Sequence, residues 1–161
     1  MSEISDKASV TVLLADFANA DAVGKLNVIG GNWTITGLQP SGLTAPQSVV
    51  VMIDVPSTLA GQSFALAVVL ADDTNNPVQL PGQPGTMRIQ QLVQVQSPVL
   101  PGVQVPPDIP CKVQMCFGFA NGIPLEGGRS YRWLVEIDTN SRPEWAATFF
   151  VAGAPPAPVI G

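Results

Sequence analysis

The stretch RSYRWLVEID at positions 129–138 alternates apolar and polar side chains with a period of two residues. The residues on its apolar face are Tyr131, Trp133, Val135 and Ile137. A helix would need apolar residues three and four positions apart, whereas a period of two is typical of a β-strand. Charged residues share the other face with Leu134, which predicts a strand with one face on a core and one face toward water.

The same alternation recurs along the chain, and turn residues separate the blocks. We expect eight strands, at about Ser9–Ala18, Lys25–Leu38, Gln47–Val55, Ser63–Asp72, Thr86–Gln96, Cys111–Ala120, Arg129–Asp138 and Trp145–Val151. Sustained helical periodicity is absent, and Ala15–Val23 could form one short turn at most. The pattern predicts an all-β protein, an antiparallel immunoglobulin-like or jelly-roll-like β-sandwich of about seven to nine strands.

Three of these segments are irregular. Ser63–Asp72 is apolar on both faces, so its strand is either central or covered on its second face. Gly30-Gly31 interrupts an expected strand, which indicates a bulge or a sharp bend between sheets. In Thr86–Gln96 the apolar phase shifts at Leu92, which predicts a bulge near Gln90-Gln91.

The alternation also predicts which side chains form the core. The expected core residues include Leu66, Val68, Val113, Phe117, Tyr131 and Trp133. Trp145 starts a strand and is expected to be partly exposed. Cys111 and Cys116 are an odd number of residues apart in one strand, so they should lie on opposite faces, about 16 Å apart. A disulfide needs Cα atoms within about 7 Å, so we expect two free thiols in a reducing compartment.

The 161 residues are sufficient for one domain. We expect an N-terminal tail at 1–8, a single sandwich at 9–151 with a proline-rich loop at 97–110, and a proline-rich C-terminal arm at 152–161. Proline cannot donate to a sheet ladder, so both proline-rich segments should run along the surface as contact arms. The residues predicted to contact partners are Pro98, Pro101, Pro106, Pro107, Pro155, Pro156 and Pro158.

Charged residues make up only 12% of the chain, about half the usual proportion near 25%. The net charge is −5 and the few basic residues are scattered, which is against nucleic-acid binding. A run of about 20 apolar residues, as a membrane span requires, is absent from the sequence. The polar residues 1–10 do not read as a secretory signal.

Histidine is absent, which removes the usual general base and the commonest metal ligand. Asp72 and Asp73, with Asn75 and Asn76 nearby, resemble a fragment of a calcium loop. The late carboxylate that such a loop needs is missing, which favours a plain hairpin turn. We therefore expect no catalytic centre, no cofactor and no metal.

Two stretches resemble a known family. ADFAN at 15–19 with GKLNVIGGNW at 24–33 is similar to the opening of a family of small uncharacterised bacterial and phage β-sandwich proteins. IPLEGGRSYRWLVEID at 123–138 is similar to that family's final hairpin. The resemblance implies the fold. The family has no established activity, so no functional residue is carried over, and the segments 79–85 and 97–110 are not part of the pattern.

A surface with few charges resists association weakly, which favours a protein covered by partners or by copies of itself. The expected function is a non-enzymatic structural or assembly protein, most specifically a phage virion component such as a capsid decoration protein. Its partners would be capsid or other virion proteins, or further copies of the chain. The alternative is a cytoplasmic bacterial β-sandwich module that binds a peptide or small ligand. The location would be the virion if a phage encodes the chain, and the cytoplasm otherwise.

Overall fold

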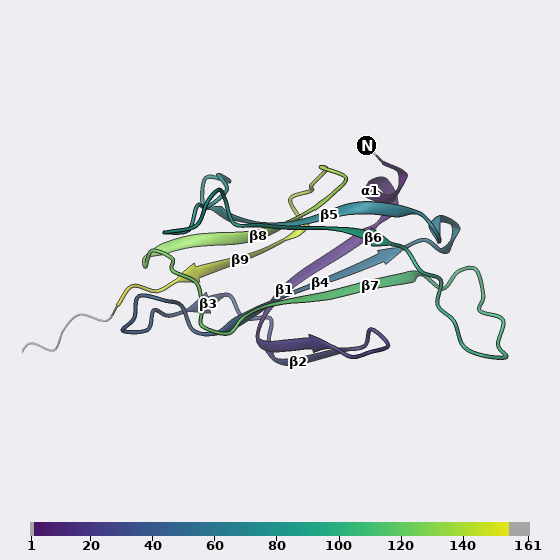
Figure 1. Cartoon of the computed structure of the whole chain (residues 1–161), viewed down its shortest axis with the longest axis horizontal. Coiled ribbons are helices and arrows are strands. Elements are labelled where there is room, and N and C mark those ends of the chain that lie inside the picture. The colour runs from purple at the N-terminus through teal and green to yellow at the C-terminus, as the bar shows by residue number, and fades with distance from the viewer. Residues whose placement is uncertain (1, 155–161) are drawn as a thin grey trace, which may run out of the picture.

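Two β-sheets face each other across an apolar core in the computed structural model, which describes residues 2–154 (Figure 1). The strands are β1 (Ser9–Ala20), β2 (Leu26–Gly31), β3 (Ile35–Thr36), β4 (Gln47–Val55), β5 (Ser63–Asp72), β6 (Arg88–Gln94), β7 (Cys111–Phe119), β8 (Arg129–Ile137) and β9 (Ala146–Val151). Two short helical segments accompany them, α1 (Glu3–Lys7) and the 3₁₀ turn η1 (Ser57–Leu59).

The strand order is β2-β1-β4-β7 in the first sheet and β3-β9-β8-β5-β6 in the second. All neighbouring strands are antiparallel except β3 and β9, which are parallel. The predicted all-β sandwich is therefore confirmed. β6 and β7 are edge strands of different sheets, and residues 95–110 connect them.

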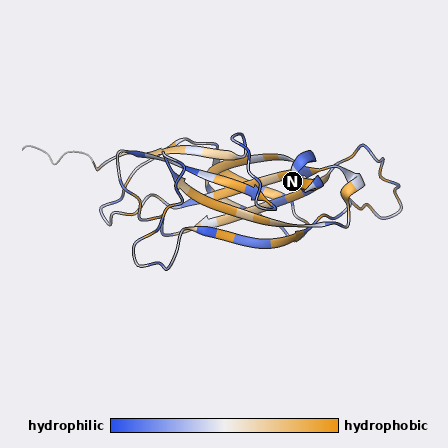
Figure 2. Cartoon of the chain, turned by 90° about the horizontal axis from the view of Figure 1, so that it is seen from above, coloured by the Kyte–Doolittle hydropathy of each residue, from blue (hydrophilic) through white to orange (hydrophobic). Residues whose placement is uncertain are grey.

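The core follows the predicted alternation. Tyr131, Trp133, Val135 and Ile137 of β8 are buried. Trp133 lies at the centre, where its ring stacks on Phe119 of the opposite sheet at a centroid distance of 5.4 Å. Leu66, Val68 and Val113 are buried as expected, while Phe117 is half-buried against the same cluster. Hydrophobic residues accordingly line the strands in Figure 2.

The expected strand Lys25–Leu38 is two strands, β2 and β3, which belong to different sheets. The pairing of β1 with β2 keeps one register on both sides of Gly30, so the glycines mark a bend and not a bulge. Gly30 has a φ of 59°, and a Cβ there would meet the carboxylate of Asp16. Asn32 follows with a φ of 63°, and the chain then leaves the first sheet.

The hairpin of β1 and β2 covers the outer face of the first sheet. Only the first half of β1, up to Ala15, pairs with β4, and the second half pairs with β2. Ala18 from this hairpin is buried in a second apolar cluster with Val50 of β4, and Leu26 of β2 packs against that cluster. This small outer cluster is why β4 is apolar on both of its faces.

β5 lies between β8 and β6, so the prediction of a central strand is confirmed. Its second face carries small residues, and the register places Ala67 between Gln90 and Glu136. The side chains of Arg88 and Glu136 form an ion pair across this face. Long polar side chains of the two neighbouring strands therefore cover Ala67, so no other helix or strand is needed to bury this face of β5.

The predicted bulge in β6 is wrong. β6 pairs with β5 in one continuous register from Ser63↔Gln94 to Val69↔Arg88. Leu92 points to the outer face and is 77% exposed. An edge strand can carry an exposed leucine without any backbone distortion, which is why the apolar phase misled the sequence interpretation.

Residues expected as an N-terminal tail form α1, which packs on the sandwich. Ile4 is buried in the main core, and the guanidinium of Arg142 donates to the carbonyls of Ser5 and Asp6 at 2.9 Å each. The same guanidinium lies 4.9 Å from the ring centre of Trp145. Trp145 is therefore only 2% exposed, which corrects the expectation of partial exposure.

Candidate interaction surface

A loop at 97–110, here called the arm, projects beyond one end of the sandwich (Figure 1, right). Two turns shape it. Pro101 and Gly102 occupy the centre of the first, which the amide of Val103 closes on the carbonyl of Leu100 at 3.1 Å. Gly102 has a φ of 75°, as the third position of a type II turn requires. The amide of Ile109 closes the second turn at 3.2 Å.

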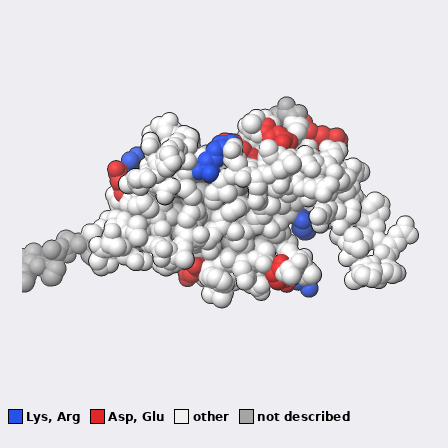
Figure 3. Space-filling view, viewed as in Figure 1, with Lys and Arg blue, Asp and Glu red and all other residues white. Residues whose placement is uncertain are grey.

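The arm presents apolar side chains to solvent. Its exposed large apolar residues are Val99, Leu100, Val103 and Ile109. Val99 is 83% exposed, and Asp108 is the one charged residue between positions 97 and 110. The projecting part of the arm is correspondingly white in Figure 3, where charged residues are coloured. Exposed apolar groups gathered on a projecting segment are typical of a protein contact site.

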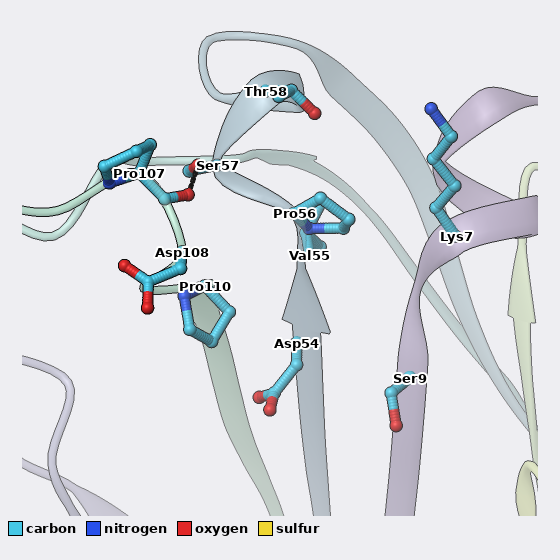
Figure 4. Close-up of a pocket in the computed structure, with 10 residues that line it drawn as sticks. All are labelled: Lys7, Ser9, Asp54, Val55, Pro56, Ser57, Thr58, Pro107, Asp108 and Pro110. Carbon is cyan, nitrogen blue, oxygen red and sulfur yellow. Dashed lines mark hydrogen bonds between the residues drawn. The ribbon is translucent and has the colours of Figure 1, made fainter.

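The base of the arm forms one wall of a groove (Figure 4). The groove has a volume of about 360 Å³, and its surface is mostly apolar. Its lining residues are Lys7, Ser9, Asp54, Val55, Pro56, Ser57, Thr58, Pro107, Asp108 and Pro110. The hydroxyl of Ser57 donates to the carbonyl of Pro107, which ties the arm to η1 across the groove.

The predicted contact prolines divide into two groups. Pro101, Pro106 and Pro107 are exposed in the arm, and Pro98 is half-buried at its start. Pro155, Pro156 and Pro158 lie outside the described residues. Sequence reasoning missed the groove, because α1, β4 and η1 bring its other walls from distant positions. Pro56, at the end of an expected strand, was the one compositional signal in that region.

Two charged side chains of the groove lie within ion pairs. The Lys7 Nζ is 2.7 Å from a Glu3 carboxylate oxygen. The carboxylate of Asp54 is 2.7 Å from the Nζ of Lys112, directly across the β4–β7 ladder. Asp108, the third charged lining residue, is exposed and forms no ion pair among residues 2–154. Apart from this one carboxylate, the paired charges and the mostly apolar surface suit an uncharged ligand better than an ionic one.

The Asp72-Asp73 segment is a hairpin turn. The Asp72 carboxylate accepts hydrogen bonds from the Thr74 hydroxyl at 2.7 Å and from the amides of Thr74 and Asn76. The Thr74 hydroxyl and then the Asn76 amide lower the pKa of Asp72 below its usual value. Asp73 pairs with Arg129 at 3.2 Å. These carboxylate oxygens are thus used by the turn itself.

The two cysteines lie on opposite faces of β7, as predicted. Cys111 is buried in the main core and Cys116 packs against the small outer cluster. Both are free thiols, and burial raises the pKa of each. A raised pKa leaves little thiolate at neutral pH, so neither thiol is prepared for nucleophilic chemistry.

Among residues 2–154, no three His, Cys, Asp or Glu side chains are grouped so that they could hold a metal ion. No helix in the same range is long and apolar enough to cross a membrane.

No family model matches the chain, and a search of curated proteins finds no match. The resemblance noted in the segments 15–33 and 123–138 therefore stays a prediction.

Proposed function

We propose that this chain is a non-enzymatic assembly protein that docks onto other proteins through the arm. In its most specific form it is a phage virion component, such as a capsid decoration protein. The observation that carries the proposal is the arm itself, because it holds Val99, Leu100 and Val103 in solvent on a segment with one charge. An isolated monomer gains nothing from that exposure, whereas a docked one buries it.

The shape of the arm supports docking with little ordering cost. Its prolines already restrict the unbound chain, and its two turns and the Ser57–Pro107 hydrogen bond restrict it further. A contact segment that is ordered before it binds loses less conformational entropy on binding than a free loop does. The low proportion of charged residues, 12% of the chain, also favours association with other proteins.

The test is incorporation into particles. Particles purified from the organism that encodes the chain would be analysed by mass spectrometry for stoichiometric amounts of it. Stripped particles would then be reconstituted with the native chain, with Leu100→Asn, or with Leu92→Asn as a control. Both leucines are exposed, but Leu92 lies on the outer face of β6 and not on the arm. We expect Leu100→Asn to lose incorporation, while the native chain and Leu92→Asn are both incorporated. Absence of the chain from every particle, together with a monomer at high concentration, would overturn the proposal.

The groove favours a second candidate function, the cytoplasmic module that binds a peptide or small ligand. Its volume of about 360 Å³ is in the range of small-ligand sites. This candidate predicts a monomer that never enters particles, so the same experiment separates the two.

A further inference from the structure

We propose that the groove beside the arm binds the proline-rich segment 155–161 of a second copy of this chain, so that copies join head to tail. The inference rests on the proposed assembly function and adds the identity of one contact. The occupant is thus a segment of this chain, whose sequence is PPAPVIG.

The groove and the origin of this segment lie at opposite ends of the sandwich (Figure 1). The amide of Ala152 donates to the carbonyl of Thr36, and the amide of Ala45 donates to the neighbouring carbonyl of Gly37. The chain therefore leaves β9 beside the beginning of β4 at Gln47. The groove is built on the other end of β4, at Val55.

The distance between these ends is too long for the segment to reach the groove of its own copy. β4 has nine residues, so its ends are about 30 Å apart. A proline-rich chain advances about 3.1 Å per residue, so seven such residues reach roughly 22 Å. A segment that starts beyond the far end cannot return to the groove of its own copy. A second copy placed end to end brings the two together without any change of fold.

The chemistry of the two partners agrees. The segment has no charged side chain, and three of its residues are proline. In the groove, Lys7 and Asp54 are already paired with Glu3 and Lys112, and Asp108 is the one further charged lining residue. The other walls include Val55, Pro56 and Pro110. Proline rings on both sides bury apolar area while little conformational freedom is lost.

A contact of this kind is heterologous, because each copy offers a different surface at each end. Repetition with the copies end to end gives a closed ring or an open filament, whereas an antiparallel pair that exchanges segments reciprocally closes as a two-fold dimer. The arm borders the groove through Pro107 and Pro110, so the incoming copy would meet both surfaces at once.

The experiment measures oligomeric state by sedimentation velocity over a wide concentration range. Thr58→Arg places a long cation at the exposed wall of the groove, and deletion of residues 155–161 removes the occupant. The control is Thr148→Arg, because Thr148 is also exposed but lies in β9, away from the groove. The thermal unfolding midpoint of each variant establishes that it folds.

We expect the native chain and Thr148→Arg to form dimers or larger oligomers whose population rises with concentration. Thr58→Arg and the deletion variant should each remain monomeric. Mixed together, these two should form one-to-one dimers and nothing larger, because one retains the segment and the other retains the groove. Full-size oligomers in either variant, or a mixture that stays monomeric, would overturn the inference.

The outcomes also separate the inference from the proposed function. A native chain that oligomerises or enters particles, with both variants behaving like it, refutes the groove contact and leaves assembly through the arm standing. A native chain that stays monomeric and enters no particle refutes both. Binding of another protein by the groove, blocked by Thr58→Arg but unaffected by the deletion, replaces the second copy with that partner.

Discussion

Replacement of Trp133 by alanine should remove the largest single contribution to the core. The side chain is fully buried in the middle of β8 and stacks on Phe119 across the two sheets. A tryptophan buries about 200 Å² of side-chain surface, which at about 25 cal/mol per Å² corresponds to roughly 5 kcal/mol. Measured losses for such truncations are about 3–5 kcal/mol.

The unpaired indole N–H of Trp133 reduces the loss of stability expected for the alanine variant. The indole N–H of Trp133 is buried and meets no acceptor among the described residues. Burial of an unpaired donor costs about 1–3 kcal/mol, and the alanine variant no longer bears that cost. We therefore expect a loss near 3 kcal/mol, which in a chain of this length lowers the unfolding midpoint by about 6–12 °C.

Guanidinium unfolding followed by far-UV circular dichroism measures the loss directly. Leu92→Ala is the control, because Leu92 is 77% exposed and its truncation should change the unfolding free energy by less than about 0.5 kcal/mol. A loss below about 1 kcal/mol in Trp133→Ala would refute the assignment of β8 side chains to the core.

Three more predictions concern local contacts. Hydrogen bonds lower the pKa of Asp72 in the folded state, so the stability they contribute is complete above the unfolded pKa near 4 and is lost as pH falls through the folded pKa. The difference in unfolding midpoint between the native chain and Asp72→Asn should therefore shrink below about pH 4, and a constant difference would contradict this. Arg142→Met should release α1, at a cost of about 1–3 kcal/mol. Hydrogen exchange at the Ala8 amide, which donates to the Ile4 carbonyl at 2.8 Å, should then accelerate while exchange in β5 stays unchanged. Cys111 should resist a thiol reagent until the chain unfolds, when both cysteines should react; recovery of fewer free thiols would be inconsistent with the β7 assignment.

Local sequence patterns predict most of the sandwich. A strand with one face in the core imposes a period of two, so Tyr131 and Trp133 could be assigned inward from their spacing alone. The apolar second face of β5 likewise predicted a strand that is central or covered on that face, and β5 lies between β8 and β6. The proline-rich arm was predictable because proline lacks the donor that a sheet interior requires.

Local patterns failed where an exposed position imitates a buried one. Leu92 looked like a core residue in a shifted phase, but an edge strand accommodates it in solvent. Trp145 looked half-exposed, but Arg142 covers it from a loop whose position depends on α1. In both cases burial depends on residues that are distant in the sequence, so the pattern of neighbouring residues could not predict it.

The sequence by itself thus determined the class of the fold, the period of its strands and the chemical character of its arm, because each depends on side chains next to one another along the chain. Only the tertiary structure decided that the β1–β2 hairpin covers the first sheet, and that Lys7, Val55 and Pro110 line one groove. Such contacts form between segments distant in sequence, and their free energy depends on how the sheets pack, which no local spacing encodes.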